Sequence, residues 1–112
     1  MAGEKSNAAI LDELYAVIES RRGGDPATSY TAKLFAKGRD HIAKKFGEEA
    51  VEAVIAATSQ SKPELIAESA DVLFHLLVLW AERDIKPAEV FAALAIRKSQ
   101  SGIEEKKNRK NT

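Results

Sequence analysis

Five acidic side chains at helical spacing in two neighbouring segments are the residues of this chain best suited to chemistry. The first segment carries Glu48, Glu49 and Glu52, and the second carries Glu68 and Asp71. Acids three or four residues apart lie on one face of a helix. Two such helices packed side by side would gather these carboxylates in a mostly apolar bundle, which is very costly unless cations are present.

A group of carboxylates of this size favours a hard divalent cation. Mg²⁺ and Mn²⁺ take oxygen ligands, and proteins usually hold them through carboxylates together with substrate phosphates. The pattern therefore predicts metal-assisted phosphate chemistry, with Mg²⁺ as the cofactor and Mn²⁺ as a substitute. The competing interpretation is a solvated helix face with salt bridges to Lys44 or Lys45. It stays open for Glu48, whereas Glu49 and Glu52 lie in or beside an apolar stripe and favour the metal site.

The elements that would position these acids are all helical, because apolar residues recur at helical spacing and no segment alternates convincingly as a strand. We predict an all-α fold with a four-helix bundle-like protomer and one short extra helix after a loop at 27–31. The expected long helices are 8–22, 40–59, 63–83 and 87–100, and the short helix is 32–37. The whole chain, 1–112, is expected to form one domain, with an ordered core of about 8–100 and a basic tail at 101–112.

The stretch 72–81 is apolar almost all round, with His75 as its one polar residue. A helix that is apolar on every side is normally buried on every side. A protomer this small cannot bury it alone, so we predict a homodimer that packs on this helix. His75 follows Asp71 by one turn and is expected to orient its carboxylate as an outer partner. The alternative interpretation is an interior histidine whose hydrogen bonds are satisfied locally.

Composition limits the partners of the chain. The 17 basic and 17 acidic residues give a net charge of zero, which argues against a general nucleic-acid binder. No apolar run reaches membrane-spanning length, and the first residues lack a signal-peptide apolar region. A cytoplasmic protein is expected. Basic residues just before the acids are candidates for phosphate contacts, or alternatively are exposed helix lysines; they are Lys37, Arg39, Lys44 and Lys45.

Three motifs resemble the phosphoribosyl-ATP pyrophosphatase family of the MazG-like all-α NTP pyrophosphatase superfamily. They are Ser29-Tyr30-Thr31-Ala32-Lys33-Leu34, Lys44-Lys45-Phe46-Gly47-Glu48-Glu49-Ala50 with Glu52, and Glu68-Ser69-Ala70-Asp71-Val72-Leu73-Phe74-His75. The resemblance covers roughly 11–97. The acids identify only the superfamily, whereas the other residues of the motifs narrow it to this family. His41 and Phe46 depart from the usual pattern, which leaves a phosphate contact at position 41 open.

The resemblance implies hydrolysis of phosphoribosyl-ATP to phosphoribosyl-AMP and pyrophosphate with Mg²⁺, in histidine biosynthesis. By match to the motifs, Glu49, Glu52, Glu68 and Asp71 would hold the metal. Glu48 would serve a second ion or position water, so that the expected catalytic group is Glu48, Glu49 and Glu52. The expected substrate contacts are Tyr30, Lys33, Lys37, Arg39, Lys44 and Lys45. The chain would be a stand-alone form, because it has no room for the cyclohydrolase domain to which many relatives are fused.

Two other functions remain open from the sequence. One is a house-cleaning NTP or dUTP pyrophosphatase, which would share the acidic site and differ at Ser29-Tyr30-Thr31. The other is a non-enzymatic helical interaction module, for which the apolar stretch 72–81 would be only a dimer or partner surface. Dependence on a metal ion separates an enzyme from such a module.

Overall fold

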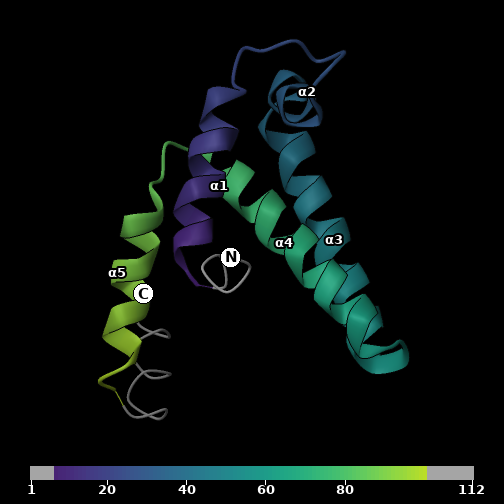
Figure 1. Cartoon of the computed structure of the whole chain (residues 1–112), viewed down its shortest axis with the longest axis vertical. Helices are drawn as coiled ribbons and strands as arrows, with labels where there is room; N and C mark the ends of the chain where they lie inside the picture. The colour runs from purple at the N-terminus through teal and green to yellow at the C-terminus, as the bar shows by residue number, and fades with distance from the viewer. Residues whose placement is uncertain (1–6, 101–112) are drawn as a thin grey trace.

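The computed structural model describes residues 7–100, which form five helices (Figure 1). Within these residues there is no strand, so the all-α prediction is confirmed. The helices are α1 (Ala9–Ser20), α2 (Tyr30–Lys37), α3 (Arg39–Ser59), α4 (Lys62–Glu82) and α5 (Pro87–Arg97). The predicted basic tail at 101–112 lies outside the described residues.

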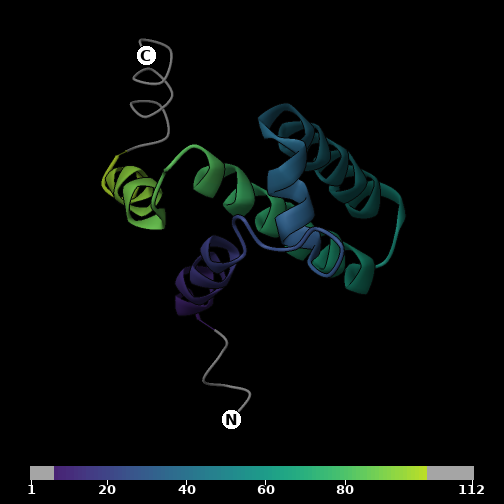
Figure 2. The ribbon, with the colours of Figure 1, turned by 90° about the horizontal axis from the view of Figure 1, so that it is seen from above.

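The antiparallel pair of α3 and α4 is the centre of the fold (Figures 1 and 2). The turn between them is short because Ser61 begins α4 with a capping box. The Ser61 Oγ accepts from the Glu64 N–H at 3.4 Å, and the Ser61 N–H donates to Glu64 Oε1 at 2.9 Å. Pro63 lies in the first turn, where its missing N–H costs no helical hydrogen bond.

The short helix α2 begins two residues earlier than the sequence pattern predicted. Ser29 is its N-cap, and the Ser29 Oγ accepts from the Ala32 N–H at 3.1 Å. This cap draws Tyr30 and Thr31, which we expected in a loop, into the first turn of the helix. Gly38 then separates α2 from α3 with a φ of 96°, a backbone conformation that side chains with a Cβ rarely adopt.

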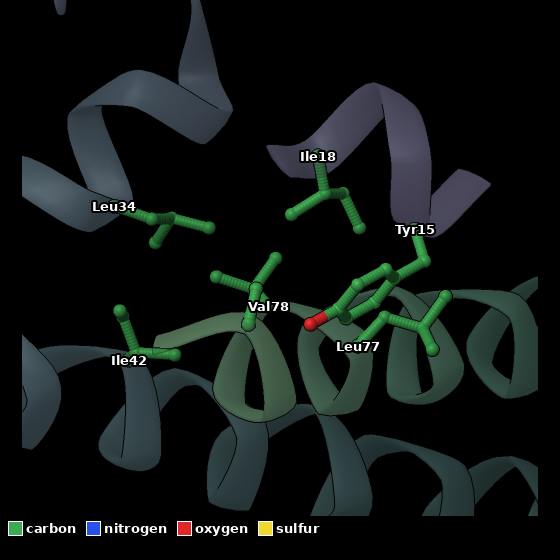
Figure 3. Packing of buried hydrophobic residues seen from close by; sticks show 7 residues of the cluster. Tyr15, Ile18, Leu34, Ile42, Leu77 and Val78 are labelled. Atoms are coloured by element: carbon green, nitrogen blue, oxygen red, sulfur yellow. The ribbon is translucent and has the colours of Figure 1, made fainter. Parts of the chain in front are cut away.

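The core lies where α1, α2 and the start of α3 meet the C-terminal half of α4 (Figure 3). Tyr15 and Ile18 of α1 cover Leu77 and Val78 of α4, and Leu34 and Ile42 close the other side. Two polar contacts fix the same end of α4: the Tyr15 hydroxyl donates to the Ile85 carbonyl at 2.7 Å, and Arg22 Nη1 donates to the Ala81 carbonyl at 2.7 Å. The C-terminal half of α4 is therefore held by side chains of α1, α2 and α3.

The expected four-helix bundle is not closed within one protomer. Helix α5 packs along α1 and stands apart from α3 (Figures 1 and 2). The radius of gyration is 16.1 Å, whereas a compact domain of 100 residues has about 13 Å. Several large apolar side chains of α3 and α4 are exposed as a result: Val51, Val54, Ile55, Ile66 and Leu73.

Candidate metal centre

Three carboxylates from two helices meet beside the α3–α4 pair. Glu49 of α3 and Glu68 and Asp71 of α4 place one oxygen each within 4.8 Å of one another. Glu49 lies seven residues after Ile42 and seven before Ala56, and both of these residues are buried. Seven residues are almost two full turns, so Glu49 shares their face and points to α4. Glu49 and Glu68 are half-buried, and Asp71 is exposed.

The electrostatics of this cluster suit a cation. Within residues 7–100, no lysine, arginine or histidine forms an ion pair with Glu49, Glu68 or Asp71. Burial raises the pKa of the Glu68 carboxyl above its usual value, and the negative charges of Glu52, Asp71 and Glu49 raise it further. Oxygen ligands without basic partners are the donor set that Mg²⁺ or Mn²⁺ prefers. The residues present therefore fit a hard divalent ion.

Repulsion in the cluster makes a prediction about stability without metal. A carboxyl whose pKa is raised in the folded state stabilises the fold fully below its unfolded pKa, near 4.5, and loses that contribution as the pH rises through the folded pKa. We expect Glu52→Gln to reduce this loss of stability, because it removes one of the charges that raise the pKa of Glu68. Its melting temperature in chelator at pH 7.5 should lie a few degrees above that of the wild type, and the gap should narrow toward pH 4.5. A melting temperature at or below the wild-type value at pH 7.5 would count against the cluster.

Glu52 and Glu48 lie outside the group of three. Glu52 is close enough for its charge to be the largest electrostatic cause of the raised pKa of Glu68. Glu48 is exposed and pairs with Lys45, whose Nζ lies 3.4 Å from Glu48 Oε1. This ion pair is the one expected for Glu48 if it lies on a solvated helix face, which was the alternative to a metal-site role. Gly47 precedes them on an open surface, because a Cβ built on it would meet nothing within 4 Å.

The basic residues that were predicted to contact phosphates differ in their surroundings. Arg39 is paired with Glu82, with its Nε 2.6 Å from Glu82 Oε1 at the opposite end of α4 from Glu68. Lys37 at the end of α2 and Lys44 and Lys45 of α3 lie near His41. Burial lowers the pKa of this histidine, and the charges of these three lysines lower it further. Lys33 is exposed on α2. A basic surface thus lies along α3, on the N-terminal side of the acids.

The contact that the structure shows between His75 and Asp71 is to the backbone of Asp71, and the predicted orientation of its carboxylate by His75 stays a prediction. His75 is buried, and its Nδ1 lies 2.8 Å from the backbone carbonyl oxygen of Asp71, one turn earlier in α4. Its Nε2 lies 3.0 Å from the hydroxyl of Tyr30. Both ring nitrogens are therefore occupied, which is the alternative of a locally satisfied interior histidine. Sequence spacing could not reveal the partnership with Tyr30, because 45 residues separate the two side chains.

Comparison with known proteins decides the family. The family model described as phosphoribosyl-ATP pyrophosphohydrolase matches residues 11–98. The chain belongs to the phosphoribosyl-ATP pyrophosphohydrolase family. A phosphoribosyl-ATP pyrophosphatase of Paramagnetospirillum magneticum is 63% identical over 103 residues, which cover 92% of this chain and 94% of the relative. One of Azospirillum brasilense is 54% identical over 111 residues, which cover 99% and 100%.

As a phosphoribosyl-ATP pyrophosphohydrolase, the chain is a hydrolase of histidine biosynthesis, which confirms the function predicted from its motifs. The acids of the cluster all fall within the matched residues. The interaction-module alternative and the general NTP pyrophosphatase alternative are therefore set aside. No helix among residues 7–100 is long and apolar enough to cross a membrane.

Proposed function

We propose that Glu49, Glu68 and Asp71 bind Mg²⁺ for the hydrolysis of phosphoribosyl-ATP, with Glu52 beside them. The observation that carries this proposal is the meeting of three carboxylates from two helices without a basic partner in the described residues. Mn²⁺ has the same preference for oxygen ligands and should substitute. Asp71, the exposed member, leaves one side of the group open to a phosphate.

An ion held by Glu49, Glu68 and Asp71 would offset the negative charge of the triphosphate. Side chains of the protein bind the phosphates, orient the attacking water and accept its proton. Lys44 and Lys45 lie on the basic surface of α3 and hold outer phosphate oxygens. Water attacks the α-phosphorus, where a new P–O bond forms as the bond from that phosphorus to the α–β bridging oxygen breaks. Pyrophosphate leaves with the electron pair of that bond, and Glu52 or Glu48 orients the water and accepts its proton.

Metal binding can be measured without any turnover. We expect Mn²⁺ titrated into the metal-free protein to lose its free-ion electron paramagnetic resonance signal, and added Mg²⁺ to release it again. Glu49→Gln and Glu68→Gln should each weaken this binding at least about 10-fold, since even outer partners of metal ligands change affinity by about 10–100-fold. Equal Mn²⁺ binding by the wild type and both variants would place the ion elsewhere.

We also propose that the protein is a homodimer through α3 and α4. Val54, Ile55, Ile66 and Leu73 are each between 43% and 61% exposed, which is unusual for four large apolar side chains on one helix pair. A second copy of the same pair would complete a four-helix arrangement around them. The measurement is the mass in solution by light scattering, for which we expect twice the chain mass of 12.2 kDa. A monomeric mass at micromolar concentration would contradict the dimer.

A further inference from the structure

Tyr30 presents its ring, and not its hydroxyl, at the edge of the candidate metal centre. It is the first residue of α2 and is 51% exposed, although Ala32 and Leu34 of the same helix are buried. Its hydroxyl is held by His75 Nε2 at 3.0 Å. His75 Nδ1 must carry a proton, because its partner, the Asp71 carbonyl oxygen, can only accept. In the neutral ring, Nε2 then accepts from the Tyr30 hydroxyl.

The ring of Tyr30 rests on the turn of α4 that follows Asp71. Phe74 lies nearly parallel to it, with ring centroids 6.2 Å apart and an interplanar angle of 26°. His75 meets the Tyr30 ring edge-on at 5.9 Å, and Phe74 and His75 are edge-on at 5.1 Å. Two aromatic rings therefore support Tyr30 from the α4 side and leave the rest of its surface to solvent.

Tyr30 also lies near Lys45 of α3. The pKa of Lys45 is raised first by its hydrogen bond to Glu48, and its nearness to Tyr30 and Glu49 contributes as well. On α4, Asp71 and His75 are four residues apart, which is about 6 Å along the axis at 1.5 Å per residue. The ring is thus held one turn beyond Asp71 on α4 and near Lys45 of α3, which pairs with Glu48.

We propose that Tyr30 is the platform on which the adenine of the nucleotide stacks, and that His75 is the positioning residue that holds its ring. The inference rests on the proposed function, which places the phosphates at the carboxylates and leaves the base one ribose away. An aromatic face binds a base by stacking and needs no free hydroxyl. Because His75 occupies the Tyr30 hydroxyl, the ring is the part of this side chain that remains for a ligand.

The test compares two probes that share phosphate chemistry and differ in the base. AMP carries adenine and pyrophosphate does not, and calorimetry with Mg²⁺ measures the binding of each. We expect Tyr30→Leu to weaken AMP about 5- to 150-fold, the range of one lost base–aromatic stack, and to leave pyrophosphate binding within about 2-fold. Tyr30→Phe keeps the ring and should restore most of the AMP affinity.

Tyr15 provides the matched control, since it is the other tyrosine of the chain and its hydroxyl is also bonded, to the Ile85 carbonyl. Tyr15→Phe should lower the melting temperature without changing AMP binding. Loss of AMP and pyrophosphate binding together in Tyr30→Leu would show that the substitution deforms the site, and unchanged AMP binding would remove the platform. Either result overturns the inference while pyrophosphate release by the wild type still supports the proposed function.

A double-mutant cycle tests the role of His75. We expect His75→Leu to weaken AMP binding in the wild-type background and to have no further effect when Tyr30 is already leucine, because the two side chains act as one unit. An equal loss of AMP affinity in both backgrounds would overturn the positioning role, since His75 would then act independently of the Tyr30 ring.

Discussion

Glu68→Gln is expected to lower kcat for pyrophosphate release by more than about 100-fold, because even partners outside the ligand shell of a metal are worth about 10–100-fold. Glutamine keeps the size of the side chain and removes its charge. Glu68 lies between the acids of both helices, with Glu52, Asp71 and Glu49 all close enough to raise its pKa. Glu49→Gln should have a similar effect from α3. The measurement is steady-state release from phosphoribosyl-ATP at saturating Mg²⁺.

Glu64→Gln is the matched control for this prediction. Glu64 stands one turn before Glu68 on the same helix, and its carboxylate accepts from the Ser61 N–H in the capping box. Glutamine also serves at this position of a capping box, so the helix should begin as before. We expect kcat within about 3-fold of the wild type, since Glu64 is not a proposed ligand and its charge is the smallest of the causes that raise the pKa of Glu68. Equal losses in Glu64→Gln and Glu68→Gln would mean that net charge, and not ligation, controls the rate.

Ile42→Ala should destabilise the protein by about 2–5 kcal/mol, the usual cost of this truncation in a packed core. Ile42 has no exposed surface and lies beside Leu34 and Val78, where three helices meet (Figure 3). It shares the α4-facing side of α3 with Glu49, two turns later, so the same packing sets the rotation of the helix that presents this acid. Urea denaturation in chelator measures the loss without a contribution from metal binding.

The control for Ile42→Ala is the same substitution at Ile10, which is 45% exposed on α1. Ile10→Ala should change stability by less than about 0.5 kcal/mol, as surface substitutions usually do. A similar loss at both positions would show that the core does not lie where the structure places it. A small loss at Ile42 alone would mean that α3 can repack, and the rotation of Glu49 would then need another cause.

The gathering of Glu49, Glu68 and Asp71 could be predicted from sequence because it depends on local periodicity. A helix turns by a fixed angle per residue, so acids at positions 68 and 71 must share a face once α4 is recognised. The short turn after Ser59, with its capping signal at Ser61, makes α3 and α4 antiparallel neighbours. The homodimer was predicted from the apolar stretch 72–81, and it stays a proposal.

The partners of the polar side chains could not be predicted in the same way. Arg39 is predicted to contact a phosphate, and the partner that the structure shows for it is Glu82, 43 residues away. The ring nitrogens of His75 lie beside a backbone oxygen and the Tyr30 hydroxyl, and the second of these partners could not be found from spacing along α4. Each of these contacts depends on how α2 and α3 settle on α4, which is a matter of tertiary packing and not of spacing along one helix. The earlier start of α2 moved Tyr30 into reach for the same reason.

The most direct test of the central claim is pyrophosphate release from phosphoribosyl-ATP, measured beside ATP and dUTP, each with Mg²⁺ and with excess chelator. We predict rapid release from phosphoribosyl-ATP, little from ATP or dUTP, and loss of all release in chelator that returns when Mg²⁺ or Mn²⁺ is restored. Release that continues unchanged in chelator would contradict the account, because the carboxylate cluster would then have no ion to hold.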